Sequence, residues 1–143
     1  MTPIKKLIVV ALIIIVAIAG LYAYKEYNRT AEDLSTVKVE ETINASDFVF
    51  AFEKDEAGAT KKFAGKTVLV TGKVAEIINQ QDTMLNIFLG DETAMSKVSC
   101  LMDIRKKETF KNILVGNQIS IKGVCTGFLA DVEMNRCIIV NEK

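Results

Sequence analysis

The sequence predicts a mainly β domain, a closed barrel of five strands, that follows an N-terminal helix long enough to span a membrane. Three observations predict it. Residues 7–24 form an unbroken apolar and aromatic run. From residue 65 onward, five stretches show the alternating apolar pattern of half-buried strands. The first of them, residues 65–78, has Gly72 near its centre, where a bend or bulge would let one strand serve two sheets.

The run over residues 7–24 predicts a transmembrane helix. Its eighteen residues carry no charge, and at about 1.5 Å each they span roughly 27 Å, close to a hydrocarbon core of about 30 Å. Aromatic rings favour the boundary between membrane and water, and three of them gather at the C-terminal end of the run, namely Tyr22, Tyr24 and Tyr27. We therefore expect contact with membrane lipid through residues 7–24.

The side of the membrane that the domain occupies is inferred from the short leader, since the Lys and Arg count, two before the run and Lys25, Arg29 and Lys38 after it, does not by itself favour a leader inside the cytoplasm. The leader, residues 1–6, carries Lys5 and Lys6 and is expected to stay in the cytoplasm, as in a signal anchor. The alternative is a cleavable signal peptide, because Ala17-Ile18-Ala19 matches a cleavage site. We favour a retained single-pass anchor in the inner (cytoplasmic) membrane, since the apolar run continues past that site. Both alternatives, anchored or secreted into the periplasm, put the domain on the extracytoplasmic side.

Residues 25–43 are predicted to form a flexible or loosely extended linker. They are polar and charged, and they show no sustained period of either 2 or 3.6. A short strand over residues 36–39 that docks on the domain is the alternative. The globular domain is then expected over residues 44–143.

A lid helix is predicted directly before the first strand. Asn44 and Ser46 are candidates for its N-cap, and Asp47 sits where the helix dipole favours a negative charge. Apolar residues then recur at helical spacing, namely Phe48, Phe52, Ala59 and Phe63. We expect this stripe to pack in the core. A break or kink is expected at Gly58, because glycine weakens a helix by about 1 kcal/mol relative to alanine.

Turns and a second helix separate the five predicted strands. The strands are expected over residues 65–78, 83–89, 96–102, 118–128 and 132–140. Residues 103–114 change to a helical period, with Asp103 as the cap. In the last strand the apolar phase shifts, which predicts a bulge near Asn135–Arg136. Three strands, a helix and two strands, with a bent first strand, is the order of the five-stranded Greek-key barrel called the OB-fold.

Four segments carry a resemblance to a known family. They are FEKDEAGATKKFAGKTVLVTGKV, VSCLM, GNQISIKGVCTGF and DVEMNRCIIV, which lie between residues 52 and 140, and the likeness as a whole covers roughly residues 46–140. The chain resembles the tRNA anticodon-binding-like OB-fold family of bacterial proteins, many of which are short chains with an N-terminal hydrophobic segment. The resemblance implies a binding module, and it carries over no functional residue because the matching positions are structural.

Composition limits the function further. Lys and Arg total 18 and Asp and Glu also total 18, so the chain has no excess of cations for non-specific nucleic-acid binding. Histidine is absent, and the three cysteines lack the CxxC spacing of zinc or redox sites. Ser-His and Cys-His nucleophile pairs are therefore excluded. We expect a protein without catalytic activity, cofactor or metal site.

Two cysteines predict a disulfide. If the last hairpin turns about Ala130-Asp131, Cys125 and Cys137 face each other, and opposed residues of an antiparallel pair have Cα atoms about 4.5 Å apart, within reach of a disulfide. The alternative is a pair of buried free thiols that act as small apolar residues. Cys100, on the inward face of the third strand, is expected to be part of the core.

The candidate ligand site follows from the fold, because OB-folds bind ligands on their second and third strands and the adjoining loops. The side chains expected there are Lys73, Asn86, Phe88, Lys97 and Ser99. Single-stranded nucleic acid needs aromatic platforms and a basic groove, and this set holds one aromatic residue. A denser basic cluster, Arg105–Lys107 with Lys111, is expected to be a solvated helix face.

These observations favour a membrane-anchored, extracytoplasmic OB-fold module that binds an unidentified protein or oligomeric ligand. The alternative is an OB-fold protein that is held at the membrane, faces the cytoplasm and binds single-stranded nucleic acid. A hydrolytic enzyme is the weakest of the three hypotheses, because no candidate nucleophile has a base in the sequence pattern.

Overall fold

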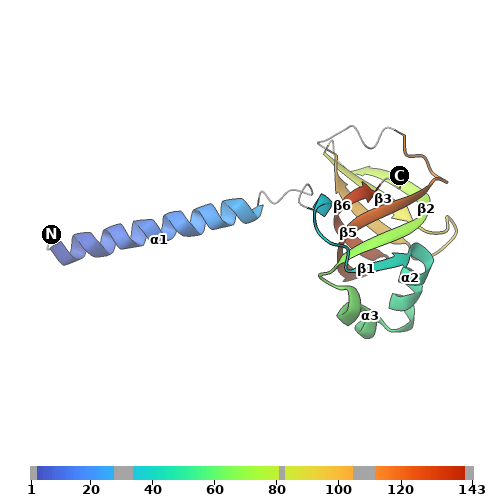
Figure 1. Cartoon of the computed structure of the whole chain (residues 1–143), viewed down its shortest axis with the longest axis horizontal. Helices are drawn as coiled ribbons and strands as arrows, with labels where there is room; N and C mark the ends of the chain where they lie inside the picture. Colours follow the sequence, from blue (N-terminus) through green and yellow to red (C-terminus); the bar gives the residue numbers. More distant parts are fainter. Residues whose placement is uncertain (1–2, 28–33, 81–82, 105–111, 141–143) are drawn as a thin grey trace. The chain divides into compact units, whose positions relative to one another are not determined.

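The computed structural model describes residues 3–27, 34–80, 83–104 and 112–140, and it divides into two compact units, Met1–Thr30 and Ala31–Lys143. The first unit contains helix α1 (Pro3–Tyr27), in the region where the apolar run predicted a helix (Figure 1). Its segment Ile8–Lys25 has a mean hydropathy of 2.4, and none of it is buried. By length and composition, this helix is able to cross a membrane.

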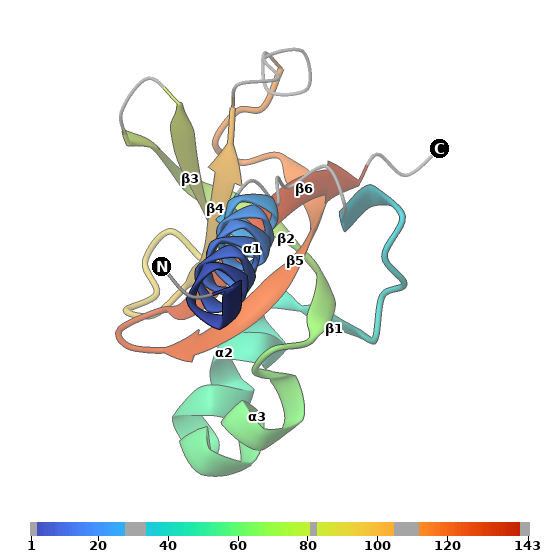
Figure 2. The ribbon, with the colours of Figure 1, turned by 90° about the vertical axis from the view of Figure 1, so that its left-hand side faces the viewer.

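The second unit is a closed barrel, which confirms the predicted OB-fold. Its strands are β1 (Glu41–Asn44), β2 (Thr67–Gln80), β3 (Met84–Leu89), β4 (Val98–Asp103), β5 (Gln118–Phe128) and β6 (Val132–Val140). They form one sheet in the order β1-β2-β3-β4-β6-β5, and the pairing of β2 with β5 closes it (Figure 2). β4 and β6 run parallel, as do β1 and β2, and the other neighbours are antiparallel.

β2 is the strand that serves two partners. Residues 67–73 pair with β5, and from Val74 onward the strand pairs with β3, with a register shift between Val74 and Glu76. Val68, Val70 and Val74 are fully buried, as their alternation predicts. Gly72 lies at the change of partner, and a Cβ there would stand 2.7 Å from the Cβ of Ala45. The glycine is therefore needed for the close approach of helix α2 as well as for the change of partner.

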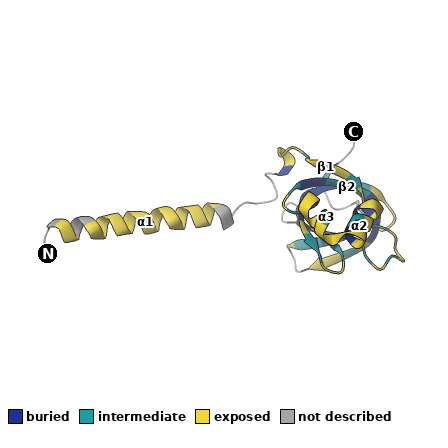
Figure 3. Cartoon of the chain, turned by 90° about the horizontal axis from the view of Figure 1, so that it is seen from below, coloured by how far each residue is buried: buried dark blue, intermediate teal, exposed yellow. Residues whose placement is uncertain are grey.

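Two helices cover one end of the barrel (Figure 3). They are α2 (Ala45–Lys54) and α3 (Glu56–Phe63). The side chain of Asn44 accepts a hydrogen bond from the backbone N–H of Ser46 at 3.0 Å, which confirms the predicted N-cap. The break, however, falls at Asp55 and not within the helix at Gly58, because the Asp55 carboxylate accepts a hydrogen bond from the Gly58 N–H at 3.0 Å and so starts a new helix.

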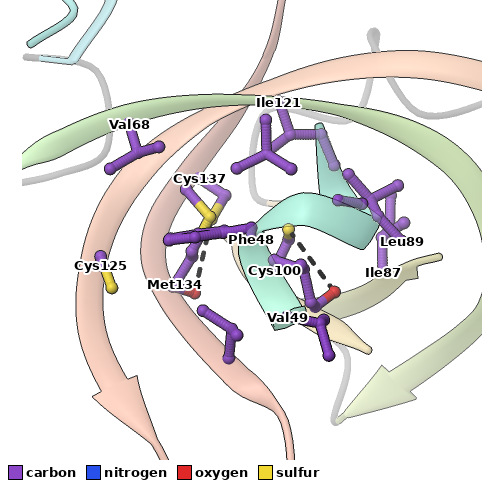
Figure 4. Close-up of a cluster of buried hydrophobic side chains, with 14 of the residues drawn as sticks. Phe48, Val49, Val68, Ile87, Leu89, Cys100, Ile121, Cys125, Met134 and Cys137 are labelled. Carbon is purple, nitrogen blue, oxygen red and sulfur yellow. Dashed lines mark hydrogen bonds between the residues drawn. The ribbon is translucent and has the colours of Figure 1, made fainter. Parts of the chain in front are cut away.

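The predicted aromatic stripe packs in the core. Phe48, Phe52 and Phe63 have ring centroids 4.9–6.2 Å apart, and Phe52 also stacks on Phe128 of β5 at 5.7 Å. Figure 4 shows Phe48 and Val49 of α2 among side chains contributed by the strands. The helices thus complete the hydrophobic core that the barrel alone would leave open at this end.

The segment before the lid is more structured than the linker expected over residues 25–43. Leu34 is buried, and the Nζ atom of Lys122 on β5 donates to the carbonyl oxygens of Ser35 and Val37 at 3.3 and 3.0 Å. The docked strand is β1, which lies at Glu41–Asn44 and not at residues 36–39. Residues 34–44 therefore belong to the folded domain. The buried ammonium group of Lys122 needs hydrogen-bond acceptors, and the backbone carbonyl groups of this segment supply them.

The second predicted helix, over residues 103–114, lies largely outside the described residues. Its expected cap, Asp103, is the last residue of β4 and pairs with Met84. Asn112 to Leu114, at the other end of the predicted helix, are not helical.

The bulge predicted near Asn135–Arg136 is confirmed. The β5–β6 register shifts between Lys122 and Val124, and Arg136 has a φ of 53°. A second shift occurs between Cys125 and Gly127. The turn pairs Phe128 with Val132, and this second shift then places Cys125 opposite Met134, so the predicted opposition of Cys125 and Cys137 was wrong. All three cysteines are free thiols.

Candidate functional site

The sequence predicted a ligand site on the outward side of β3 and β4, which are the second and third of the five predicted barrel strands. We call it the β3–β4 face and define it by Asn86 and Phe88 on β3 and Ser99 and Leu101 on β4. The register pairs Phe88 with Ser99 and Asn86 with Leu101. Their neighbours along the strands point into the core, and these are Ile87, Leu89, Val98, Cys100 and Met102, all fully buried. The structure thus brings three of the predicted site residues, Asn86, Phe88 and Ser99, together.

Polar groups on this face are bonded to each other. The Nδ2 atom of Asn86 donates to the Oγ atom of Ser99 at 2.9 Å, and the Ser99 hydroxyl is 3.1 Å from the Oδ1 atom of Asn86. Asn86 is only 7% exposed. Because the polar groups of Asn86 and Ser99 are bonded to each other, this pair links the two strands. The accessible part of the face is largely made by the half-buried side chains of Phe88 and Leu101.

Of the two predicted lysines, Lys97 lies in the loop that joins β3 to β4, and Lys73 lies on β2 beside that loop. The Nζ atom of Lys73 stands 3.5 Å from the Oε1 atom of Glu92 in that loop, with both side chains about half exposed. The backbone N–H of Lys97 donates to the Asp131 carboxylate at 2.7 Å, which ties the loop to the β5–β6 turn. The structure therefore partners one of the two cations, Lys73, with an acid.

The loop itself is acidic and ordered by its own hydrogen bonds. Asp91 accepts from the side chain and the backbone N–H of Thr93, at 2.7 and 2.8 Å. These two hydrogen bonds are the main reason that the pKa of Asp91 is lowered, with smaller contributions from the charges of Lys73 and Lys97. Asp91 is therefore a fixed negative charge at neutral pH.

Sequence reasoning missed an open cleft beside this loop. Its volume is about 350 Å³, and it lies between α2 and the loop. We call it the α2–loop cleft, and its lining residues are Ala45, Ser46, Val49, Phe50, Glu53, Gly90, Asp91, Ala94, Met95 and Ser96. One feature of the sequence pointed to it. Phe50 is offset from the stripe that contains Phe48 and Phe52, so a helix that buries the stripe leaves Phe50 facing outward.

The thiols belong to the core. The Sγ atom of Cys137 donates to the Met134 carbonyl at 3.4 Å, and that of Cys100 lies 3.9 Å from the Val98 carbonyl (Figure 4). Burial raises the pKa of Cys125 and raises that of Cys137 strongly, so both remain protonated and unreactive at neutral pH. Within the described parts of the chain, no three His, Cys, Asp or Glu side chains are grouped as metal ligands.

Comparisons with known proteins agree with this fold. The sequence model of the tRNA_anti-like family matches residues 1–139. Among solved structures, a predicted nucleic acid-binding lipoprotein from Klebsiella pneumoniae is similar, with a TM-score of 0.57 and 13% identity over 77% of this chain and 97% of its own. Asparaginyl-tRNA synthetase from Entamoeba histolytica matches 57% of this chain with 22% of its own, at 16% identity and a TM-score of 0.44. No curated protein matches the sequence.

Proposed function

Because the chain belongs to the tRNA_anti-like family of OB-fold binding domains, we propose that it is a membrane-anchored binding module without catalytic activity of its own. In this proposal α1 crosses the inner (cytoplasmic) membrane once, residues 1–6 stay inside, and the barrel works on the extracytoplasmic side. The observation that carries the proposal is the combination, in one chain, of an exposed apolar helix with an OB-fold barrel.

The helix supports an anchor made by the polypeptide itself. The segment Ile8–Lys25 has the length and hydropathy of a membrane span, and the tyrosines at its C-terminal end suit the headgroup region. The similar protein from Klebsiella pneumoniae is called a lipoprotein. The cysteines of this chain stand at positions 100, 125 and 137, buried in the barrel and more than 70 residues along the sequence from the apolar run. A transmembrane helix is therefore the attachment that we propose here.

We assign ligand binding to the β3–β4 face together with Lys73 and Lys97 at its loop end. Phe88 and Leu101 offer apolar contact area, and the two lysines add polar contacts at the rim. Such a mixed surface, with few net charges, suits a protein or another oligomeric ligand better than a polyanion.

A second candidate function is the binding of single-stranded nucleic acid. The family name and the name of the Klebsiella pneumoniae protein favour it. The electrostatics of the described face disfavour it, since Lys73 is paired with Glu92 and the face has one aromatic ring, Phe88.

Membrane topology tests the first candidate. A reporter that is active only outside the cytoplasm is fused after Lys143, and a reporter active only in the cytoplasm serves as its counterpart. Activity of the first and silence of the second are expected. The opposite result contradicts the extracytoplasmic assignment.

Oligonucleotide binding separates the two candidates. The full chain in zwitterionic detergent is titrated with a fluorescent single-stranded oligonucleotide at low and at high salt. We expect no binding at either ionic strength. Binding that weakens steeply with salt would show phosphate neutralisation and would favour the nucleic-acid candidate.

A further inference from the structure

The segment before β1 lies on the barrel without belonging to its sheet or its core. We call residues 34–39 the strap, and Figure 1 shows it running along the outside of the barrel to β1. Leu34 is 4% exposed, but it stands outside the cluster of buried side chains that forms the core. The rest of the strap is largely open to solvent, and Val37 is 41% exposed. The strap is therefore attached to a barrel that β2 and β5 close without it.

Lys122 of β5 is the barrel residue that the strap covers. The side chain of Ile121 faces the core and is fully buried, so alternation along β5 turns Lys122 outward. An outward lysine is ordinarily exposed, yet Lys122 is only 7% exposed. Its Nζ atom donates to the carbonyl oxygens of Ser35 and Val37. The strap thus buries this ammonium group and supplies its hydrogen-bond acceptors.

Opposing contributions act on the closed strap. The buried ammonium group of Lys122 has lost its water, which costs free energy, and the two carbonyl groups offset that cost. Burial of Leu34 favours the closed position. Opening returns the ammonium group to water and exposes one leucine, while the pairings of β5 with β2 and β6 stay formed. A segment with so few buried apolar contacts opens far more easily than the whole domain unfolds.

Glu40 sets the limit of such an opening. Its backbone N–H donates to the Thr67 carbonyl at 2.9 Å, and its carboxylate accepts from the Thr67 N–H at 2.8 Å. β1 follows directly and pairs with β2, and its Ile43 packs against the core. An opening that begins at Leu34 therefore ends at Glu40 and leaves β1 and the helices in place.

We propose that the strap opens and closes on the intact barrel, with Lys122 as its latch and Glu40 as its hinge. In the open state, residues 34–39 join residues 28–33 in the chain between α1 and the barrel, which doubles the length of that chain and adds about 20 Å to its reach. This consequence rests on the proposed membrane anchor. With α1 in the bilayer, the open strap lets the barrel work farther from the membrane surface than the closed strap does.

Amine labelling tests this proposal on the full chain in detergent. Acetylation by an amine-reactive reagent is followed at each lysine by mass spectrometry, and a thiol reagent reports in parallel on the three buried cysteines. We expect Lys122 to react more slowly than the exposed Lys61, because its reaction waits for opening, and to react while all three thiols remain unmodified. Low concentrations of urea should leave the rate at Lys122 almost unchanged, since a local opening exposes little surface.

Substitutions separate the buried anchor of the strap from its solvent-facing part. Leu34→Ser should raise the acetylation rate of Lys122 about tenfold, because the burial of the leucine is lost. Val37→Ser removes a similar side chain at an exposed position, so it is the matched control and should leave the rate unchanged.

Three outcomes would overturn the proposal. They are acetylation of Lys122 as fast as that of Lys61, acetylation of Lys122 only together with the thiols, and a rate at Lys122 that Leu34→Ser does not alter. Each is independent of the topology reporter fused after Lys143, which alone decides the membrane anchor.

Discussion

At the end of the barrel that α2 and α3 cover, Phe48, Phe52 and Phe63 are each no more than 2% exposed, whereas Phe88 on the β3–β4 face stays half-buried. The first three rings are held by each other and by Phe128. Phe88 lies opposite Ser99 and is flanked by a polar pair. The difference shows that most of the described aromatic side chains of the domain stabilise its core, and that few of them are left to contact a ligand on the strands.

The largest expected effect comes from truncating a ring at the covered end. Phe48→Ala should lower the free energy of unfolding by about 4 kcal/mol, through lost burial and a cavity between helix and strands. Phe88→Ala, the matched change on the open face, should cost only about 1 kcal/mol because the ring is partly solvated. Urea unfolding of the full chain in detergent, followed by circular dichroism, measures both. Similar losses for the two variants would remove the distinction between the covered end and the open face.

A smaller loss of stability is expected from a substitution at Gly72, where α2 of the covered end packs on β2. Gly72→Val should destabilise the fold by about 2 kcal/mol, since a Cβ would approach the Cβ atoms of Ala45 and Leu89 to 2.7 and 3.3 Å and force helix and strand apart. Lys73→Val, which places the same side chain at the next, exposed position, is the control and should cost little. The same urea measurement applies. An unaltered midpoint for Gly72→Val would mean that α2 does not rest on β2 at this point.

The smallest effect is expected from reducing agent. The three cysteines are buried and free, so reductant should not change the unfolding midpoint. Thiol labelling without reductant should be slow in the folded protein and should modify all three cysteines after denaturation. Labelling of a single cysteine in denatured protein would reveal a disulfide, and with it a covalent restraint on the core that the free-thiol structure lacks.

Local periodicity was sufficient to predict most of the barrel. The strands over residues 118–128 and 132–140 have the predicted bounds, because their alternation and turn residues are local properties. The bulge at Arg136 was also predictable from the phase change of the apolar residues. The partner of Cys125 was not predictable, since the turn pairs Phe128 with Val132 and a second shift near Gly127 moves the register again, and neither leaves a trace in the apolar pattern. The break at Asp55 was missed because a side-chain cap outweighed the low helix propensity of Gly58.

Of the candidate site, the sequence could predict only which residues share one face of a strand. Alternation put Asn86, Phe88 and Ser99 on one side, and the register brings them together. It could not reveal that Asn86 and Ser99 satisfy each other, or that Glu92 reaches Lys73 from a loop 19 residues away. The docking of residues 34–44 depends on Lys122, which is distant in sequence. Contacts of this kind depend on tertiary structure, which a single sequence window does not encode.

The packing of residues 34–44 has a mechanical consequence. Lys122 of β5 holds the carbonyl groups of Ser35 and Val37, and β1 is hydrogen-bonded along β2. β2 and β5 are themselves paired over residues 67–73. A pulling force that arrives along the chain from its N-terminal side is therefore spread over several hydrogen bonds of the barrel wall before it reaches Asn44. The helix α2, which begins directly after that residue, is shielded from the tension, and so are the cleft and the core that depend on its position.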